Sequence, residues 1–343
     1  MNAAMRTLLA ALLFTGACAS DTAKVDPTAE QILEFGPYDL SPGQEVVSTC
    51  VQISLHNEET MFVNSVELTT GPGFHHSNWF WVPETTFAGE DGSWKCDDRN
   101  FNEAAAAVFG GVLFAQSTQA PHEIQKFPTG VVIKVPPRSK IVSQIHLLNP
   151  TDQPLTIHPT IAIKPIVEAD VVTLLAGISF EDQALGLPPH MQSRFSVECD
   201  LAPKHQQIFG RAPDFKIYYA LAHYHSLGTK LSLEAIKPTG ESTVVYSTEH
   251  NVGDVLGGPI DPQFSMVGYT KLRMSCEFNN PRDQTVGWGV GDQEMCVFLA
   301  FSDSPYNWGG GVLEEDPPGN PMLDGNMMTF SNNCSLYAID ASR

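Results

Sequence analysis

Short runs of alternating apolar and polar residues, each long enough for one β-strand, recur along most of this chain. The segment Val51-Gln52-Ile53-Ser54-Leu55 alternates strictly, which is the period of a strand with one buried face. Clusters of Pro, Gly and Asn separate further β-rich runs, at Val131–Val135, Ile141–Leu148, Thr160–Ile166, Lys216–Ala222, Lys230–Ile236 and Met295–Phe301. Only one short segment, Glu103–Val108, is typical of a helix. The pattern therefore predicts an all-β fold.

The length of the chain predicts how many β units it forms. Its 343 residues, of which 42% are hydrophobic, suit two domains better than one. We expect two tandem β-sandwiches of the jelly-roll kind. Lys164-Pro165 is a plausible junction, which gives domains at 44–165 and 166–343. Residues 302–333 are rich in Gly, Pro and acids without a clear period, so we expect a functional loop or a loosely packed C-terminal wrap there, with Gly309-Gly310-Gly311 as loop glycines.

The charge of the chain restricts its partners. The 19 Lys and Arg stand against 39 Asp and Glu, a formal charge of −20. Nucleic acid is not an expected partner, because phosphate binding needs clustered basic residues, and an anionic membrane surface is disfavoured for the same reason. A P-loop, a GxGxxG after a strand and a GxSxG elbow are all missing from the sequence, so nucleotide and serine-triad chemistry have no support.

The first residues are typical of an export signal. Residues 1–17 contain a single positive charge, Arg6, then an apolar run from Leu8 to Phe14 and small residues. Cys18 follows Thr15-Gly16-Ala17, which resembles the lipobox of bacterial lipoproteins, although Leu is usual where Thr15 stands. We therefore expect residues 18–43 to be a polar tether. The predicted location is the bacterial cell envelope as a lipoprotein, touching the membrane only through lipid on Cys18, or the periplasm or exterior after plain secretion.

Six further cysteines remain in the exported part of the chain. They are Cys50, Cys96, Cys199, Cys276, Cys296 and Cys334. An even number in an oxidising compartment favours three disulfides, and spacing alone does not choose the pairing. A thiolate metal site is the competing use, but the sequence has no CxxC pair.

Two pairs of histidines stand out among the eleven in the chain. His223 and His225 flank one residue of a predicted strand, so both side chains lie on one face. His75 and His76 are adjacent, and both can reach one metal only at a strand end or bend, which Gly71-Pro72-Gly73 can supply. Either pair alone could arise by chance. Six other histidines lie singly and are assigned no role: His56, His122, His158, His190, His205 and His250.

One further possible ligand follows each pair at the same interval. His146 follows His76, and Met295 follows His225, by equal numbers of residues. Three imidazoles, and two imidazoles with a thioether, are both competent copper sites, and the soft thioether favours Cu(I).

These motifs together resemble the copper type II, ascorbate-dependent monooxygenases, a family that includes peptidylglycine α-hydroxylating monooxygenase and dopamine β-monooxygenase. The matching segments occur in the family's order over roughly residues 44 to 340, and they are His75-His76, Gln144-Ile145-His146 with Asn149-Pro150, His223-Tyr224-His225-Ser226-Leu227-Gly228, and Glu294-Met295-Cys296. The resemblance implies two jelly-roll domains, each with one copper, on the two sides of a solvent-filled cleft. It also implies the disulfides Cys276–Cys296, Cys199–Cys334 and Cys50–Cys96.

The resemblance further implies a division of roles between the two copper ions. His75, His76 and His146 would hold an electron-transfer copper. The catalytic set His223, His225 and Met295 would hold the copper that binds dioxygen and attacks a substrate C–H bond. Dioxygen, a small-molecule substrate and an electron donor such as ascorbate are the implied partners.

The sequence departs from the family pattern at three positions. Ser77 stands where Met usually follows the His pair, but that residue is not a ligand. Leu221 and Leu299 stand where the peptide-amidating enzyme has the Arg and Tyr that anchor a substrate carboxylate. We therefore expect a small apolar substrate and no peptide amidation. Two alternatives remain: an exported copper-binding or storage protein without turnover, and a structural sandwich with a single metal site.

Overall fold

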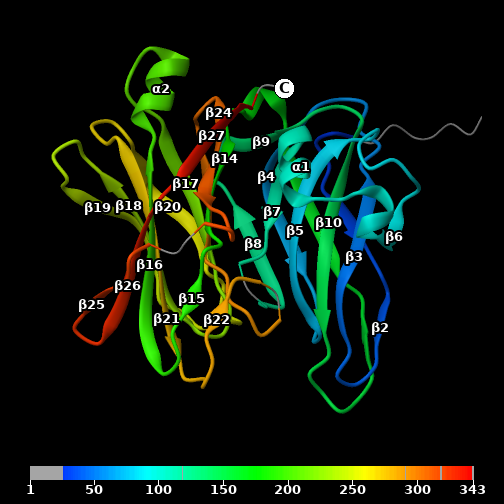
Figure 1. The fold of residues 1–343 in the computed structure, drawn as a ribbon. Helices are drawn as coiled ribbons and strands as arrows, with labels where there is room; N and C mark the ends of the chain where they lie inside the picture. The colour runs from blue at the N-terminus through cyan, green and yellow to red at the C-terminus, as the bar shows by residue number, and fades with distance from the viewer. Residues whose placement is uncertain (1–25, 118, 290, 317–318, 342–343) are drawn as a thin grey trace, which may run out of the picture.

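A computed structural model describes residues 26–117, 119–289, 291–316 and 319–341, and confirms the predicted all-β class (Figure 1). The predicted signal peptide and Cys18 lie outside the described residues. The two halves of the chain lie side by side, the first in blue to green and the second in green to red. Within the described residues no helix is long and apolar enough to span a membrane.

The first half of the chain contains two larger sheets. The strand order is β1-β12-β4-β9-β13, with β8 paired to β4, in one sheet and β6-β3-β10-β5-β7 in the other. The bounds in the first sheet are β1 Gln31–Glu34, β4 Met61–Thr69, β8 His122–Lys126, β9 Val131–Val135, β12 Thr160–Ile166 and β13 Thr173–Leu174. Those in the second are β3 Glu45–Ser54, β5 Phe74–Pro83, β6 Gly92–Lys95, β7 Gly111–Ala115 and β10 Ser139–Leu148. Smaller elements are β2 Tyr38–Leu40 with β11 Leu155–Ile157, η1 Cys96–Arg99, η2 Glu168–Asp170 and α1 Glu103–Phe109, which confirms the predicted helix.

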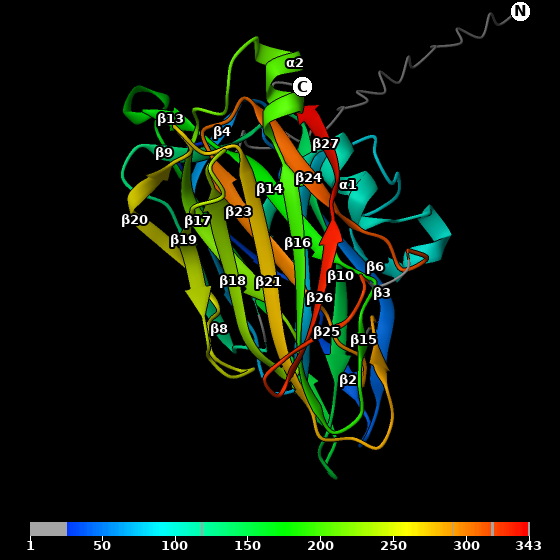
Figure 2. The ribbon, with the colours of Figure 1, turned by 60° about the vertical axis from the view of Figure 1, so that its left-hand side comes forward.

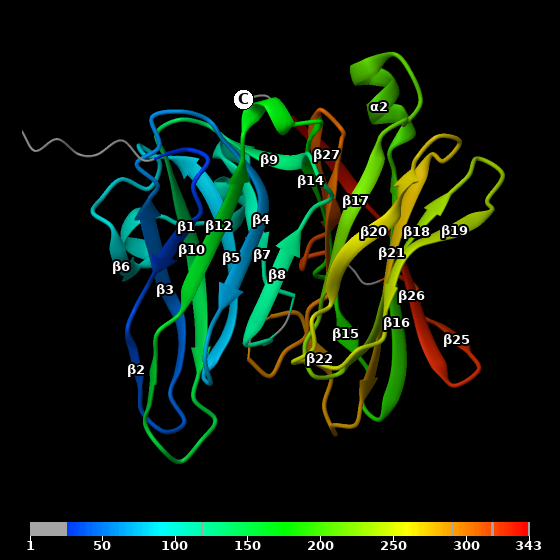
Figure 3. The ribbon, with the colours of Figure 1, turned by 180° about the vertical axis from the view of Figure 1, so that it is seen from behind.

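The second half also contains two larger sheets, seen from other sides in Figures 2 and 3. Their strand orders are β20-β17-β23-β14-β24-β27 and β19-β18-β21-β16-β26-β25. The bounds in the first are β14 Ala176–Asp182, β17 Lys216–His223, β20 Gly257–Ser265, β23 Val297–Ser302, β24 Tyr306–Val312 and β27 Ser335–Asp340. Those in the second are β16 Met191–Asp200, β18 Gly228–Ile236, β19 Ser242–Thr248, β21 Lys271–Asn280, β25 Met322–Asp324 and β26 Met327–Asn333. Smaller elements are β15 Gly186–Leu187 with β22 Val286–Gly287, and helix α2 Ala202–Phe209.

Sheet pairing changes partners between β13 and β14. Strand β13 still pairs in parallel with β9 of the first half, whereas β14 pairs with β23 and β24 of the second. The predicted domain boundary at 165/166 falls near the end of β12, ahead of this change.

The two halves share apolar packing through β17 and β23. Alternate residues of β17 face opposite ways, as the two-residue period of a strand requires. Ala220 and Ala222 belong to the core of the second half, while Tyr219 and Leu221 pack into the core of the first half. Phe301 of β23 joins them there. His223 has the same parity as Leu221, so it too faces the first half.

The expectation of a loop or wrap over 302–333 is wrong. Strand β24 pairs with β14 on one side and β27 on the other, and β26 pairs in parallel with β16. Gly309, Gly310 and Gly311 lie in β24, and they are glycines because neighbouring groups approach too closely for a side chain. A Cβ at Gly309 would strike the Tyr337 ring, and one at Gly311 would strike the Glu181 carbonyl oxygen. Strands packed this tightly need no regular polar alternation.

The three predicted disulfides are confirmed. Cys50 of β3 bonds to Cys96 of η1, and Cys199 of β16 bonds to Cys334, which lies between β26 and β27. Cys276 of β21 bonds to Cys296, just before β23. Disulfides of this kind persist in oxidising compartments, and the chain is accordingly an exported protein.

Candidate metal centre

The first predicted ligand set lies on two paired strands. His146 of β10 stands opposite His76 of β5, and the register then shifts so that Leu147 faces Phe74. His75 is therefore an extra residue on β5, as in a β-bulge. This irregularity brings the ring of His75 to 4.3 Å from that of His146, measured between centroids, so the predicted bend at the adjacent pair is present.

The second set lies where β17 ends. His223 is the last residue of that strand, and His225 lies beyond it, so the prediction that both lie inside a strand is wrong for His225. The Ser226-Leu227 turn that leads into β18 ends the strand early. The two rings nevertheless meet, with centroids 5.3 Å apart and planes at 89°.

Hydrogen bonds fasten the segment that carries Met295 to this turn. The Glu294 carboxylate accepts from the backbone N–H of His225 (2.9 Å) and of Leu227 (2.7 Å), and the Gln293 carbonyl accepts from Nδ1 of His225 (2.8 Å). Cys296, the residue after Met295, is linked to Cys276 of β21 by a disulfide. Met295 consequently lines the same cavity as His223 and His225, as the second predicted set requires.

The two sets are not separated by the solvent-filled cleft that the resemblance implied. The ring centroids of His76 and His223 are 4.4 Å apart, and those of His75 and His225 are 6.3 Å apart. The shared packing of Tyr219, Leu221 and Phe301 with the first half closes the gap. The five histidines form one cluster at the interface between the halves.

The loop between β7 and β8 contacts a histidine of each set. The carbonyl oxygen of Ser117 accepts from Nδ1 of His223 (2.8 Å), and its hydroxyl accepts from the backbone N–H of Leu256 (2.9 Å). The Glu123 carboxylate accepts from the Ser117 N–H at 3.0 Å. The Gln119 amide lies 2.6 Å from Nε2 of His75. Sequence reasoning missed Ser117 and Gln119, because a contact that uses a backbone carbonyl leaves no motif.

Acceptor-only partners fix which ring nitrogen carries the proton in three of the histidines, His146, His223 and His225. A carbonyl can only accept, so the Nδ1 atoms of His223 and His225 carry their protons and Nε2 keeps a lone pair. His146 Nε2 lies 2.8 Å from the Glu45 carboxylate, which leaves its Nδ1 free. Three ring nitrogens are buried with no partner: Nδ1 of His75, Nδ1 of His76 and Nε2 of His223. The ring nitrogens without a hydrogen-bond partner are therefore Nδ1 in the first set and Nε2 in the second. The Gln119 side-chain nitrogen can only donate to Nε2 of His75, so Nδ1 of His75 carries the proton until that amide turns its oxygen to the ring.

Burial keeps the imidazoles of His75, His76, His223 and His225 neutral. It lowers the pKa of His75 to about 3, with smaller contributions from the nearby His146 and His225. Burial lowers the pKa of His223 to about 3 as well, and the hydrogen bond that His223 donates to the Ser117 carbonyl opposes this by raising the pKa. The pKa values of His76 and His225 are also lowered, first by burial. Neutral imidazole is the form that binds a metal.

A cavity of about 370 Å³ lies beside the cluster. We call it the interface cavity; it lies between the sheet of β5 and β10 and the sheet of β17 and β23. Its predicted residues are His76, His146, His223, His225 and Met295, with Leu221 and Leu299 among the apolar ones. Other lining residues used below are Asn78, Phe80, Glu103, Val112, Glu181, Trp288, Val297 and Tyr337.

The donor set fits copper, although the rings do not form a finished site. Within the described part of the chain, no three His, Cys, Asp or Glu side chains stand in a ready metal-binding arrangement. The ring of His76 packs on His223 of the other set, so ring rotation would have to precede metal binding. The residue types present, imidazoles and a thioether, are ones that copper accepts as ligands, and three of the imidazole nitrogens are buried without a partner.

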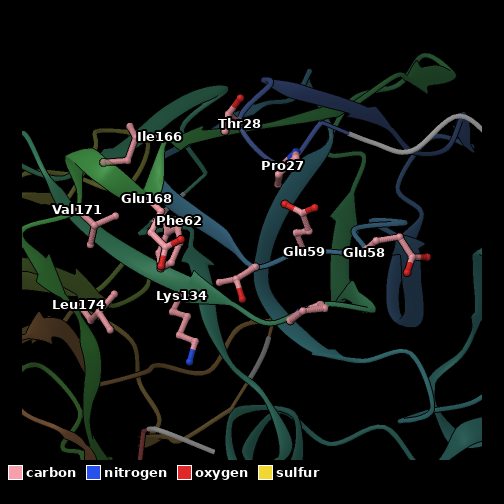
Figure 4. Close-up of a pocket in the computed structure, with 12 residues that line it drawn as sticks. Pro27, Thr28, Glu58, Glu59, Phe62, Lys134, Ile166, Glu168, Val171 and Leu174 are labelled. Carbon is pink, nitrogen blue, oxygen red and sulfur yellow. The ribbon is translucent and has the colours of Figure 1, made fainter.

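A larger cavity of about 800 Å³ lies elsewhere, beside β4 and β9 (Figure 4). Lys134 shares it with three glutamates, Glu58, Glu59 and Glu168. None of the predicted ligands lines it, and it has no imidazole or thiol. The histidine cluster is therefore the candidate site.

Comparison with known proteins adds little. The chain matches no known protein family and no curated protein. A protein described as secreted, from Parabacteroides distasonis, is 11% identical with a TM-score of 0.21, over 82% of this chain and 91% of its own. The PBSX exported protein XepA is 8% identical with a TM-score of 0.20, over 80% and 87% of the two chains. The VP2 subviral particle of infectious bursal disease virus gives 9% and 0.20, over 82% and 72%. TM-scores this low carry no argument about function.

Proposed function

We propose that this exported protein is a copper-dependent monooxygenase of the ascorbate-dependent type II kind, which hydroxylates a C–H bond of a small, largely apolar substrate. Dioxygen and an external reductant such as ascorbate are the co-substrates. The observation that carries the proposal is the set of three buried ring nitrogens without a partner, on His75, His76 and His223. A buried polar atom is costly unless something satisfies it.

Each proposed histidine ligand would use the ring nitrogen that has no hydrogen-bond partner, and the Gln119 amide would turn its oxygen to Nε2 of His75. His75, His76 and His146 would hold one copper through Nδ1, and His223, His225 and Met295 would hold the other through Nε2 and the thioether sulfur. When bound, the two ions would supply electron transfer and dioxygen activation. The hydrogen bonds from His223 to Ser117 and from His225 to Gln293 hold the proton on Nδ1 and keep Nε2 available.

The surroundings of the cluster suit reaction with an apolar molecule. Leu221 and Leu299 pair across β17 and β23 and both line the interface cavity. They exclude water beside the second set and offer no charge to a substrate carboxylate. The residues of the chain would thus bind and orient the substrate and keep the site dry.

Export has a further proposed detail at the N-terminus. Cys18 in its lipobox-like context would carry a lipid that anchors the chain to the bacterial envelope. Mass spectrometry of the mature N-terminus tests this detail, because a lipidated cysteine and a freely secreted chain differ by the mass of the acyl groups.

Metal content and oxygen uptake test the proposed function. The purified chain, loaded with copper and freed of excess, is expected to retain two copper ions. Ascorbate-dependent oxygen uptake should then rise when small apolar substrates are supplied, with one labelled oxygen atom from dioxygen in the product. A single copper ion, or a preference for zinc, contradicts the proposal. Two retained copper ions without substrate-dependent uptake would favour the alternative, an exported copper store.

A further inference from the structure

The interface cavity contains two carboxyl groups that the proposed copper ligands do not use. Glu103 comes from α1 in the first half, and Glu181 comes from β14 in the second. The side-chain amide of Asn78 donates to Glu103 at 3.2 Å. The cavity lining contains no Lys or Arg, and among the described residues neither carboxylate forms a salt bridge with a cation. Two acids from opposite halves thus face one space without a counter-charge.

One further acceptor atom in the same cavity lacks a donor. Oδ1 of Asn78 is buried without a partner, and Asn78 lines the interface cavity. Buried acceptors and carboxylates are satisfied by a ligand that brings hydrogen-bond donors and positive charge.

The remaining walls are apolar. Phe80 and Val112 line the cavity from the first half, and Leu221, Val297 and Leu299 line it from the second. The cavity volume of about 370 Å³ lies within the range of small-molecule sites. Apolar walls beside paired acids suit a molecule with one charged end and one apolar end.

We propose that the interface cavity binds a small amphiphilic organic cation, with its ammonium group at Glu103 and Glu181 and its apolar body against Leu221, Val297 and Leu299. That this ligand is also the substrate rests on the proposed function, whereas its binding does not. Burial raises the pKa of Glu103 to about 7, and the neighbouring Glu181 adds to this rise. A bound ammonium ion would favour the ionised carboxylates and oppose that rise.

Binding to the copper-free protein at pH 8 tests the inference without turnover. The probes are benzylamine, benzyl alcohol and benzoate, which differ mainly in the charge of one group, and the readout is the Kd from calorimetry. Benzylamine is expected to bind about tenfold tighter than benzyl alcohol, and benzoate should not bind. The double variant Glu103→Gln/Glu181→Gln should raise the Kd of benzylamine about tenfold and leave that of benzyl alcohol unchanged. Glu103→Gln keeps an oxygen that can accept from Asn78.

Matched controls keep the outcomes distinct. Glu58→Gln makes the same change in the cavity of Figure 4 and should leave the Kd values of benzylamine and benzyl alcohol unchanged. The single variants replace the double variant if it does not fold. Equal binding of benzylamine and benzyl alcohol, or benzylamine binding unchanged by the glutamine variants, would overturn the inference. Amine binding that depends on the two glutamates, in a protein that consumes no oxygen with copper, leaves the inference standing and removes the proposed function.

Discussion

The imidazole rings of His76 and His223 lie 4.4 Å apart between centroids, although they belong to opposite halves of the chain. His76 stands on β5 and His223 ends β17. This contact joins two ligand sets that sequence motifs assign to separate copper ions. The two sets are therefore in direct packing contact.

Replacing His76 is expected to disturb both copper ions. His76→Ala should lower the copper content towards one per chain and also change the Cu(II) electron paramagnetic resonance spectrum of the remaining ion, since the ring that packs on His223 is lost. His146→Ala is the matched comparison, because its ring packs on His75 of the same set. We expect that variant to lose one ion and to leave the second spectrum unchanged. Identical second-site spectra in both variants would contradict the coupling.

The buried neutral histidines predict how the stability of the copper-free chain depends on pH. Their pKa values in the folded chain are lowered, to about 3 for His75 and His223, so the unfolded chain binds more protons below pH 6.5. The stability they contribute is complete above pH 6.5 and is lost as the pH falls towards 3. Each group adds a slope of about 1.4 kcal/mol per pH unit to the free energy of unfolding.

Urea unfolding at several pH values measures this slope. His75→Ala/His223→Ala should give a shallower dependence between pH 6 and 4 than the wild type, whatever its absolute stability. Burial raises the pKa of Glu123 to about 7, which acts in the opposite direction, but this effect is common to both proteins. Parallel curves for variant and wild type would show that these histidines are protonated in the folded chain.

Gln119 is expected to act through His75. Gln119→Leu removes the amide that lies 2.6 Å from Nε2 of that ring while keeping a similar volume. Loss of such an outer contact lowers metal affinity by about 10- to 100-fold, and only at the first site. Gln153→Leu, at an exposed turn, is the control. Competition with a Cu(I) chelator measures both variants, and an unchanged affinity in Gln119→Leu would remove this role.

The Cys276–Cys296 disulfide is expected to support the second site as well as the fold. Cys276→Ser/Cys296→Ser opens a loop with a sequence separation of 20, which should destabilise the chain by about 3 kcal/mol. It should also weaken copper binding at Met295, because the adjacent Cys296 is no longer linked to β21. Cys50→Ser/Cys96→Ser also lowers stability but leaves the second site unchanged. Denaturant unfolding and metal titration separate the two effects, and equal losses of second-site affinity would contradict the prediction.

Sequence patterns predicted elements whose signal is local. The alternation at Val51–Leu55 predicted β3, which ends at Ser54, although Gln52 is buried there as well as Val51. The short helix predicted from Glu103 is α1. The histidine pairs also came together with His146 and Met295 beside one cavity, because each lies on or next to a strand of two facing sheets. Motifs of this kind carry information about which residues meet, but little about how far apart two sites lie.

Other features had no local signal. Strand β24 contains three glycines, which normally weaken a strand, and their reason is the close approach of Tyr337 and Glu181 from other strands. The contact of Ser117 with His223 uses a main-chain oxygen, which any residue type provides. The closed interface depends on the packing of Tyr219, Leu221 and Phe301 across the two halves, and a single strand pattern does not reveal the partner of its second face.

The hydrogen bond from His223 to the Ser117 carbonyl has a consequence for how this architecture can be divided or recombined. A gene fragment that encoded β14 to β27 alone would leave the Nδ1 proton of His223 with no acceptor from the first half. The backbone N–H of Leu256 would also lose its hydrogen bond to the hydroxyl of the same serine. The second ligand set therefore depends on residues of the first half and cannot be transferred to another protein with the second half alone. Duplication or shuffling of either half by itself would yield an incomplete site, so the two halves must be inherited as one unit.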